Sequence, residues 1–352
     1  MAGLHMHRRE FGFSLIAASA TVATGSLPFA ALATPAPEPD PFALVDPELM
    51  AAARALPPFS VNSATLPLMR AMPGRPVAPA PAPQPQFRSI PGPSGAPDLR
   101  IMLIDGTGGT ANSPAYLHMH GGGFVGGRVD QYPAAYQALA VACQCLIVSV
   151  DYRLAPETRF PGALEDNYAA LRWLNAHAAE LGIDPRRIAI GGESAGGGHA
   201  AMLAIAARDR GEFPIAFQML IYPMLDDRTG STVVPPPHIG RILWKAESNR
   251  FGWGALLGQE AGLATVPPGS VPARVADLSG LPPAFVAVGG LDLFVAEDIA
   301  YASRLNESGV PVELMVVPGA YHGFDGLVPN ARISRQFRTA IVDALKRGMA
   351  VR

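Results

Sequence analysis

The spacing of hydrophobic positions in this sequence changes at about residue 87. Beyond it, short apolar runs alternate with longer segments whose apolar residues recur every three or four positions. The short runs are typical of strands buried on both faces, and the longer segments are typical of amphipathic helices. Strands are expected at 99–104, 115–119, 145–150, 187–190, 216–221, 284–288 and 312–317, and helices at 162–181, 195–210, 296–308 and 332–347.

Strand–helix alternation over this length predicts an α/β fold with a mostly parallel central sheet and helices on both faces. Parallel neighbours need a crossover connection, usually a helix. Short turns join the first two or three strands instead, which is compatible with antiparallel pairing. We expect one catalytic domain spanning 87–352.

Two regions depart from this rhythm and are expected to form a helical cap. Residues 223–283 interrupt the alternation with three consecutive prolines and two of the three tryptophans. An insert at the carboxyl side of a strand lies where ligands bind in open α/β sheets. The alternative is a surface excursion with its own small core.

The N-terminal cap segment, 34–86, contains two predicted helices and a Pro-rich linker. Asp46 and Pro47 are a typical N-cap and first helical residue for a helix that ends at Leu56. A weaker helix is expected at 66–71, followed by an extended, polyproline-like linker over 73–85.

Residues 1–33 resemble a secretory signal. Arg8 and Arg9 precede an uncharged, moderately apolar stretch, and Ala31 and Ala33 occupy the positions that a signal peptidase reads. The paired arginines indicate the twin-arginine route, with the general secretory route as the other export pathway compatible with the pattern, so we expect an exported, periplasmic or secreted protein. The alternative is a membrane anchor, which the glycines, serines and threonines disfavour. We expect no stable membrane span in the mature form.

Composition excludes several classes of protein. The chain is 49% hydrophobic, carries a formal net charge of −2 and has a pI near 6.4, so it is neither disordered nor suited to nucleic acid. Cys143 and Cys145 are expected on one face of a strand as core residues. His118 and His120 could suggest a metal pair, but no third ligand is in view, so no metal is expected.

The stretch around Ser194 carries the strongest chemical signal. A strand runs into the pattern G-x-S-x-G and then into an alanine-rich helix. This context is typical of a nucleophilic serine on a sharp turn. Gly192 and Gly196 are needed there because a Cβ at either position would collide with the neighbouring strand or helix.

A serine hydroxyl needs a general base to become a nucleophile. His322 follows the last predicted strand, where the order Ser, acid, His places the base. His238, in the insert, is the rival. His199 is too close to Ser194 along the next helix, and His177 lies on a helix with polar neighbours.

The acid is expected after a strand between the serine and the histidine, and Asp292 is at that place. Glu297 and Asp298 follow on the next helix and are interpreted as solvated residues of its first turn. Asp325 is only three residues beyond His322 and is the weaker choice.

Three consecutive glycines after a strand complete the constellation. Gly121, Gly122 and Gly123 follow His120 and let backbone N–H groups point inward without side chains in the way. We expect the amides of Gly122, Gly123 and Ala195 to form an oxyanion hole.

These motifs together resemble the hormone-sensitive-lipase-like family of α/β-hydrolases. The likeness rests on His120–Gly123, Asp151–Glu157, the Ser194 turn, Asp292 and Tyr321–Phe324, in this order, and extends from about Asp46 to the C-terminus. The resemblance implies an α/β-hydrolase fold with a cap, a serine carboxylesterase acting on short- to medium-chain acyl esters, and no cofactor.

The resemblance also implies a structural role for Asp151, Arg153 and Glu157. The sequence departs from the family where Glu193 precedes the serine, since Asp is commoner there. It departs again at Leu293, where Pro is frequent after the acid. Both positions lie beside the expected site without removing a reacting group.

Two other functions remain compatible with the motifs. One is an amidase or peptidase that uses the same triad, and the other is a ligand-binding homologue that has lost catalysis. The expected partner is a small-molecule ester, with no nucleic acid, and the protein is a monomer or a homodimer.

Overall fold

The computed structural model describes residues 40–72, 83–131 and 133–350. The predicted signal, 1–33, and most of the predicted extended linker lie outside these residues. The division of the chain into signal, cap segments and catalytic domain therefore stays a prediction. Within the described ranges, no helix combines the length and hydrophobicity that crossing a bilayer requires.

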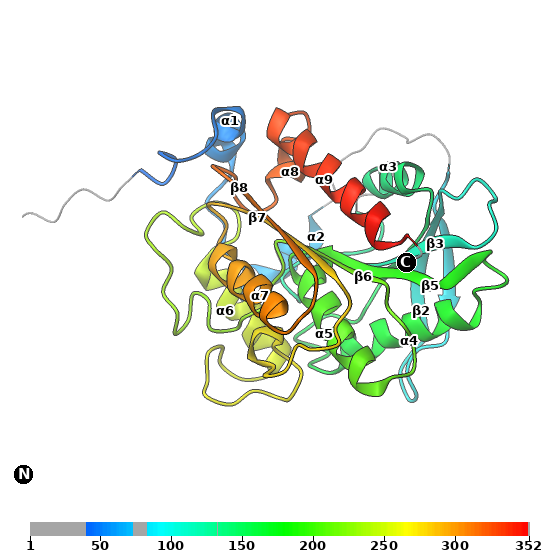
Figure 1. The fold of residues 1–352 in the computed structure, drawn as a ribbon. Helices are drawn as coiled ribbons and strands as arrows, with labels where there is room; N and C mark the ends of the chain where they lie inside the picture. Colours follow the sequence, from blue (N-terminus) through cyan, green and yellow to red (C-terminus); the bar gives the residue numbers. More distant parts are fainter. Residues whose placement is uncertain (1–39, 73–82, 132, 351–352) are drawn as a thin grey trace, which may run out of the picture. The chain divides into compact units, whose positions relative to one another are not determined.

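One eight-stranded sheet forms the centre of the fold (Figure 1). The strand order is β1-β2-β4-β3-β5-β6-β7-β8, with β1/β2 and β2/β4 antiparallel and all other pairs parallel. The strands are β1 (Gln86–Ile90), β2 (Leu99–Asp105), β3 (Ser113–Met119), β4 (Leu146–Val150), β5 (Ile183–Glu193), β6 (Phe217–Ile221), β7 (Ala284–Gly289) and β8 (Val312–Val317). The predicted α/β class and mostly parallel sheet are confirmed.

The strand order defines the pairing of the first strands. The antiparallel pairing that short turns allowed for the first strands is found for β2, which pairs in this way with β1 and β4, whereas β3 lies on the other side of β4 and is parallel to it. The strand β1, which the hydrophobic pattern missed, is exposed at every residue except Ile90. Its pattern is weak because it is an edge strand that buries little.

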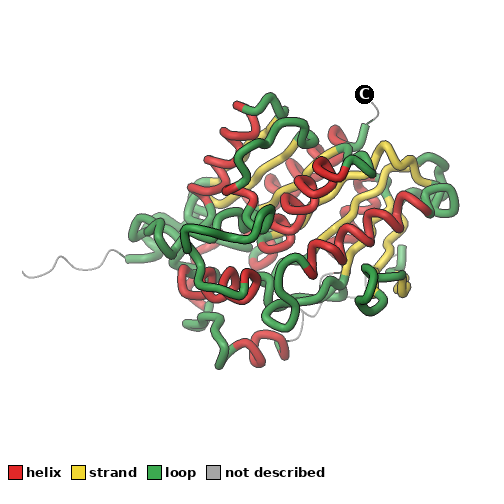
Figure 2. Tube along the Cα trace, turned by 90° about the horizontal axis from the view of Figure 1, so that it is seen from below, coloured by secondary structure: helices red, strands yellow, loops and turns green. Residues whose placement is uncertain are grey.

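Helices cover both faces of the sheet (Figures 1 and 2). On one face α4, α5 and α7 pack in a first core cluster, and on the other α3 and α9 pack in a second. The helices are α1 (Pro47–Ala55), α2 (Leu66–Ala71), α3 (Pro133–Cys143), α4 (Gly162–Ala176), α5 (Ala195–Arg210), α6 (Ala246–Leu257), α7 (Val295–Glu307), α8 (Phe324–Leu327) and α9 (Arg332–Gly348), with a short 3-10 helix at Pro272–Arg274.

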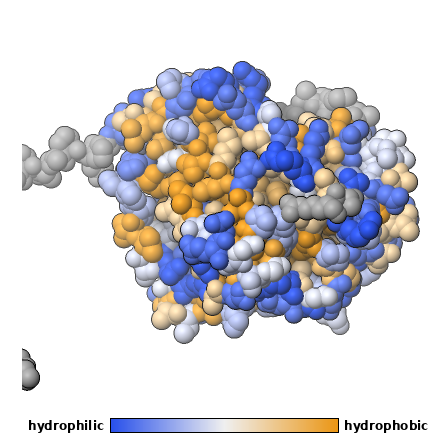
Figure 3. All heavy atoms as spheres, viewed as in Figure 1, coloured by the Kyte–Doolittle hydropathy of each residue, from blue (hydrophilic) through white to orange (hydrophobic). Residues whose placement is uncertain are grey.

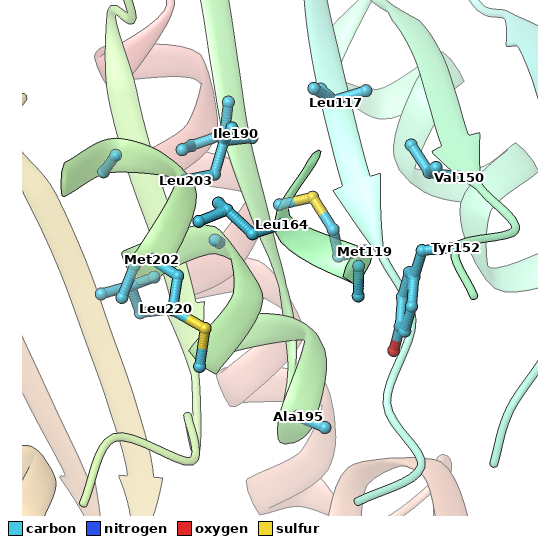
Figure 4. Packing of buried hydrophobic residues seen from close by; sticks show 14 of the residues in the cluster. Leu117, Met119, Val150, Tyr152, Leu164, Ile190, Ala195, Met202, Leu203 and Leu220 are labelled. Atoms are coloured by element: carbon cyan, nitrogen blue, oxygen red, sulfur yellow. The ribbon is translucent and has the colours of Figure 1, made fainter. Parts of the chain in front are cut away.

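Alternation along each strand divides its side chains between the two cores. In β3, Leu117 and Met119 belong to the first cluster, whereas Tyr116 belongs to the second. Figure 4 shows how Leu117, Met119 and residues of β5, β6 and α5 converge in the first cluster. Because both faces are covered, the strands are continuous apolar runs, as expected.

The edge strand β8, like β1, is an exception to this burial. Leu314 and Val316 are 39% and 37% exposed. On the face drawn in Figure 3, hydrophobic residues gather over the region where Figure 1 places β8.

Three helices were not given bounds from the sequence, namely α3, α6 and the four-residue α8. In α3 the apolar residues surround the helix without a clear stripe. The helix α6 lies inside the insert that was expected to contribute to a helical cap, although no helix bounds were predicted there. The presence of α3 corrects the interpretation of the cysteines. Cys143 is the last residue of α3 and Cys145 precedes β4, so they do not share a strand face, although both are buried free thiols.

The N-terminal helices agree with the sequence pattern. The Asp46 carboxylate accepts a hydrogen bond from the backbone N–H of Glu48 at 2.8 Å, so Asp46 is the N-cap of α1. Leu49 and Ala53 bury the inner face of this helix. The second predicted helix, 66–71, is α2 with the same bounds.

His199 is a buried polar residue in the first core. Its ring lies on α5 with its edge against Phe124 and Tyr152, at centroid distances of 5.0 and 4.6 Å. Among the described residues, neither ring nitrogen has a hydrogen-bond partner. Burial lowers the pKa of His199 to about 3, so the imidazole is neutral in the folded protein.

This burial predicts a pH-dependent stability. Unfolding releases His199 to its ordinary pKa near ~6.5, so between that value and about 3 only the unfolded chain binds this proton. The contribution of neutral His199 to the free energy of unfolding is therefore complete above about pH 6.5 and is lost as the pH drops toward about 3. His199→Phe should reduce the slope of unfolding free energy against pH by ~1 kcal/mol per unit, measured by urea denaturation between about pH 6 and 4.

The matched control is His238→Phe, since His238 is exposed in the insert. It should leave the slope of the wild type unchanged. Equal slopes for wild type and His199→Phe would contradict the account of His199.

Candidate active site

Ser194 lies on a tight turn between β5 and α5. Its backbone has φ +58° and ψ −120°, a strained conformation for a residue with a Cβ. A Cβ on Gly192 or on Gly196 would lie 2.0 Å from the carbonyl oxygen of Met119, at the end of β3. The predicted need for glycine at both positions is confirmed, and β3 is the element they approach.

The turn brings Ser194 to His322 and Asp292. His322 Nε2 is 3.0 Å from Ser194 Oγ, and His322 Nδ1 is 2.7 Å from Asp292 Oδ2. The other carboxylate oxygen, Asp292 Oδ1, accepts the backbone N–H of Phe294 at 3.0 Å. All three side chains are buried. The structure thus places the predicted serine, base and acid in one hydrogen-bonded chain.

Aromatic side chains confine the imidazole of His322. The rings of Tyr222 and Phe294 meet it edge to face, at 4.8 and 5.3 Å between centroids. The Tyr222 hydroxyl donates to Asp325 at 3.1 Å, and burial raises the pKa of that carboxyl. Asp325 therefore fixes the position of Tyr222, whose ring contacts the imidazole of His322. Sequence reasoning did not single out Tyr222, although its place directly after β6 was visible.

Internal hydrogen bonds hold the backbone carbonyls of the glycine loop. The Tyr152 hydroxyl donates to the carbonyl of His120 at 2.6 Å, and His120 Nδ1 lies 2.9 Å from the carbonyl of Gly121. Burial lowers the pKa of His120 to about 4, so its neutral ring donates here from Nδ1. The carbonyl of Gly122 accepts the N–H groups of Val125 and Gly126, at 3.1 and 2.9 Å.

The amides of the same loop are left without partners. Among the described residues, no acceptor is found for the backbone N–H groups of Gly122 and Gly123 in the loop, or for that of Ala195 at the start of α5. A Cβ on Gly121 would lie 3.5 Å from the Cβ of Ser194, so the loop adjoins the serine directly. The predicted oxyanion donors are therefore grouped beside the predicted nucleophile.

The insert packs closely on this loop. A Cβ on Gly123 would lie 2.2 Å from the ring of Trp244, and one on Gly252, in α6, would lie 2.5 Å from the carbonyl of Gly123. Trp244 Nε1 donates to Asn249 at 3.2 Å, and Asn249 donates to the carbonyl of Thr229 at 2.8 Å. These bonds within the insert fix the orientation of the tryptophan.

Glu193, which departs from the family pattern, is the hydrogen-bond partner of His118, one of the two histidines considered as metal ligands. His118 Nε2 is 2.9 Å from Glu193 Oε2, and His118 Nδ1 is 2.7 Å from Ser149 Oγ. These three residues connect the adjacent strands β4, β3 and β5 beneath the Ser194 turn. The ring nitrogens of His118 thus have protein partners. No group of three potential metal ligands occurs in the part of the chain that the structure describes.

The interpretation of Glu297 and Asp298 as solvated residues is wrong. Both side chains are buried, because α7 packs its first turn against the start of the insert. Glu297 Oε1 accepts the N–H groups of Leu225 and Asp226, at 2.7 and 3.2 Å. Burial raises the pKa of both carboxyls well above the ordinary range, and the charges of Glu297 and Asp292 raise that of Asp298 further.

The segment from Asp151 to Glu157 makes the contacts of a structural element. Asp151 lies 3.4 Å from Arg100, and Arg153 binds the fully buried Asp166 with a closest distance of 2.7 Å. Glu157 pairs with Arg70 at 2.7 Å, and hydrogen bonding to that guanidinium lowers the pKa of Glu157 to about 2.

The rival histidines lie in other surroundings. His177 caps α4, where its Nδ1 is 2.9 Å from the carbonyl of Trp173 and its ring stacks on the indole. His238 is exposed in the insert. The histidine hydrogen-bonded to Ser194 is His322.

Comparison with known proteins identifies the family. A protein-family model with the description alpha/beta hydrolase fold matches residues 116–326 of the sequence. Esterase LipI of Mycobacterium tuberculosis is 39% identical over 247 residues, which cover 69% of this chain and 76% of that protein. An ethyl acetate hydrolase of Pseudomonas putida is 36% identical over 217 residues, covering 60% and 65%. The solved structure of a bacterial heroin esterase aligns with a TM-score of 0.76 and 37% identity over 88% of this chain and 99% of that one. The chain therefore belongs to the hormone-sensitive-lipase-like family of α/β-hydrolases and is a carboxylesterase of that family.

Proposed function

We propose that the protein hydrolyses short- to medium-chain acyl esters with Ser194 as nucleophile, His322 as general base and acid, and Asp292 as the carboxylate that orients the imidazole. The observation that carries this assignment is the continuous chain of hydrogen bonds from Ser194 Oγ through the imidazole to Asp292. Asp292 Oδ2 accepts from Nδ1, which leaves Nε2 unprotonated and directed at the hydroxyl.

The reaction proceeds by acyl transfer to water. His322 takes the Ser194 proton as the oxygen attacks the ester carbonyl, and the N–H groups of Gly122, Gly123 and Ala195 stabilise the oxyanion. The C–O bond to the alcohol breaks, and the alcohol leaves with the proton from His322. A water molecule then gives a proton to His322 and attacks the acyl carbon. His322 returns that proton to Ser194 Oγ as the bond between the acyl carbon and the serine oxygen breaks and the acid leaves.

Replacing the nucleophile gives the direct test. Ser194→Ala should reduce kcat for p-nitrophenyl butyrate by at least about 10⁴-fold with unchanged thermal stability, because the residual rate comes only from binding and the oxyanion hole. Ser334→Ala, a buried serine on α9, is the control that should keep substantial activity. Wild-type turnover by Ser194→Ala would refute the assignment.

The preference for short and medium acyl chains rests on the surroundings of the glycine loop. The Trp244 ring contacts Gly123, and its centroid is 6.4 Å from that of His322. Together with Phe294 it places bulky aromatic side chains close to the reacting atoms. A relative named for ethyl acetate hydrolysis supports the same size range.

Activity across p-nitrophenyl esters from two to sixteen carbons measures this preference. We expect kcat/KM to peak at or below about eight acyl carbons and to fall at least about tenfold by sixteen, because long acyl chains would collide with the rings of Trp244 and Phe294. Trp244→Ala should shift the maximum toward longer chains. A maximum at sixteen carbons in the wild type would contradict the proposal, and p-nitroanilides serve as amide controls.

We further propose that the protein is exported. Paired arginines, a moderately apolar stretch and small residues before Thr34 support a twin-arginine signal. The near-neutral composition of the remaining chain is compatible with a periplasmic or secreted enzyme.

Exchange of the paired arginines tests the route. The double variant Arg8→Lys with Arg9→Lys should leave the esterase in the cytoplasm, whereas the wild type reaches the periplasm or medium. Cell fractionation with activity staining measures the distribution, and Arg335→Lys with Arg338→Lys on α9 is the charge-matched control. Unchanged export of the first variant would rule out the twin-arginine route.

A further inference from the structure

The glycine loop is bound from outside the catalytic domain at one carbonyl. The carbonyls of His120, Gly121 and Gly122 are held by residues of the same domain. The carbonyl of Val125, at the end of the same turn, instead accepts Nε of Arg70 at 2.7 Å. Arg70 belongs to α2, so the Pro-rich N-terminal segment reaches the backbone of the predicted oxyanion loop.

The remaining donors of Arg70 extend this contact into a closed ring. One terminal nitrogen donates to the carbonyl of Ala155 at 2.9 Å, while the N–H of Ala155 donates to the carbonyl of Phe124 at 3.0 Å. The guanidinium also binds Glu157 through two hydrogen bonds of 2.7 and 2.8 Å. Loop, guanidinium and the Ala155 segment thus brace one another.

Apolar contacts place the same turn between two helices. A Cβ on Gly126 would lie 3.0 Å from the terminal methyl of Met69, in α2. Gly252 of α6 also lies against the turn, since a Cβ built there would be 2.5 Å from the carbonyl oxygen of Gly123. The backbone N–H of Val61 donates to the buried Ser248 hydroxyl of α6 at 2.8 Å, which joins the N-terminal segment to that helix.

We propose that Arg70 is a positioning residue for the oxyanion hole, acting through its hydrogen bonds to the carbonyls of Val125 and Ala155. The inference rests on the proposed function of Gly122 and Gly123 as oxyanion donors. These amides stabilise negative charge only while they point at the position of the oxyanion, and a small displacement costs much of the rate. A planar guanidinium binds two carbonyls and a carboxylate at once, which a lysine ammonium cannot reproduce.

Three variants separate backbone bracing from a simple ion pair. Arg70→Met and Arg70→Lys should each lower kcat for p-nitrophenyl butyrate by about tenfold or more with KM within about twofold, because the loss falls on the transition state. Glu157→Gln removes the charge pair but leaves the carbonyl contacts, so its kcat should stay within about threefold of the wild type.

Arg210→Met is the matched control for loss of a half-exposed, ion-paired arginine. The side chains of Arg210 and Arg70 are 33% and 30% exposed, and Arg210 pairs with Glu165 on α4. Arg210→Met should keep kcat and KM. Thermal midpoints of all variants show whether they are folded. If Arg70→Met does not fold, the kcat of the conservative variant Arg70→Lys decides whether Arg70 positions the loop.

The outcomes are distinct. Recovery of wild-type kcat in Arg70→Lys, or an equal loss in Glu157→Gln and Arg70→Lys, would overturn the inference, because the ion pair alone would then be what matters. A wild-type kcat in Arg70→Met would overturn it as well. Failure of the proposed function would be seen in a different variant, since Ser194→Ala would then keep the turnover of the wild type.

Discussion

Close approach of backbone to backbone at the end of β3 is the constraint on which the rest of the site depends. Gly192 and Gly196 leave no room for a Cβ because the carbonyl of Met119 occupies that space. This contact sets the Ser194 turn against the start of the glycine loop. Every later feature of the site, from the strained serine to the unpaired amides, builds on these two chain segments being in direct contact.

The loop that carries those amides is held from many directions. Its own carbonyls bond to Tyr152, His120 and the following turn, while α6 and α2 cover it from two sides. These two helices complete the packing of a loop whose glycines cannot hold a conformation alone, since glycine has no side chain to pack and much backbone freedom to lose.

Local sequence patterns predicted the reacting groups and the sheet class well. Ser194, Asp292 and His322 each follow a predicted strand, and the carboxyl ends of parallel strands meet at one edge of a sheet, so their order along the chain indicated that they lie together. The strand order was less accessible, because β2 and β4 pair across a long separation in sequence. The burial of Glu297 could not be foreseen either. It depends on backbone amides of the insert that lie more than 70 residues away.

Arg70 and Trp244 show the same limit at the site itself. The sequence predicted a helix around Arg70 and a cap insert around Trp244, but neither side chain carried a signal of its own. Their contacts are with a carbonyl and a glycine far away in the chain. The departures from the family pattern were visible, yet the link between Glu193 and His118 required knowing that β3 and β5 are neighbours. Spacing predicts what lies on one element, whereas tertiary packing decides what faces it.

The most direct test of the central claim is covalent labelling of the folded enzyme with a fluorophosphonate, followed by peptide mass spectrometry. A nucleophilic serine activated by His322 should give one adduct per chain, on Ser194, with loss of esterase activity in proportion to labelling. An adduct on another residue, or an active enzyme that is fully labelled at Ser194, would contradict the account.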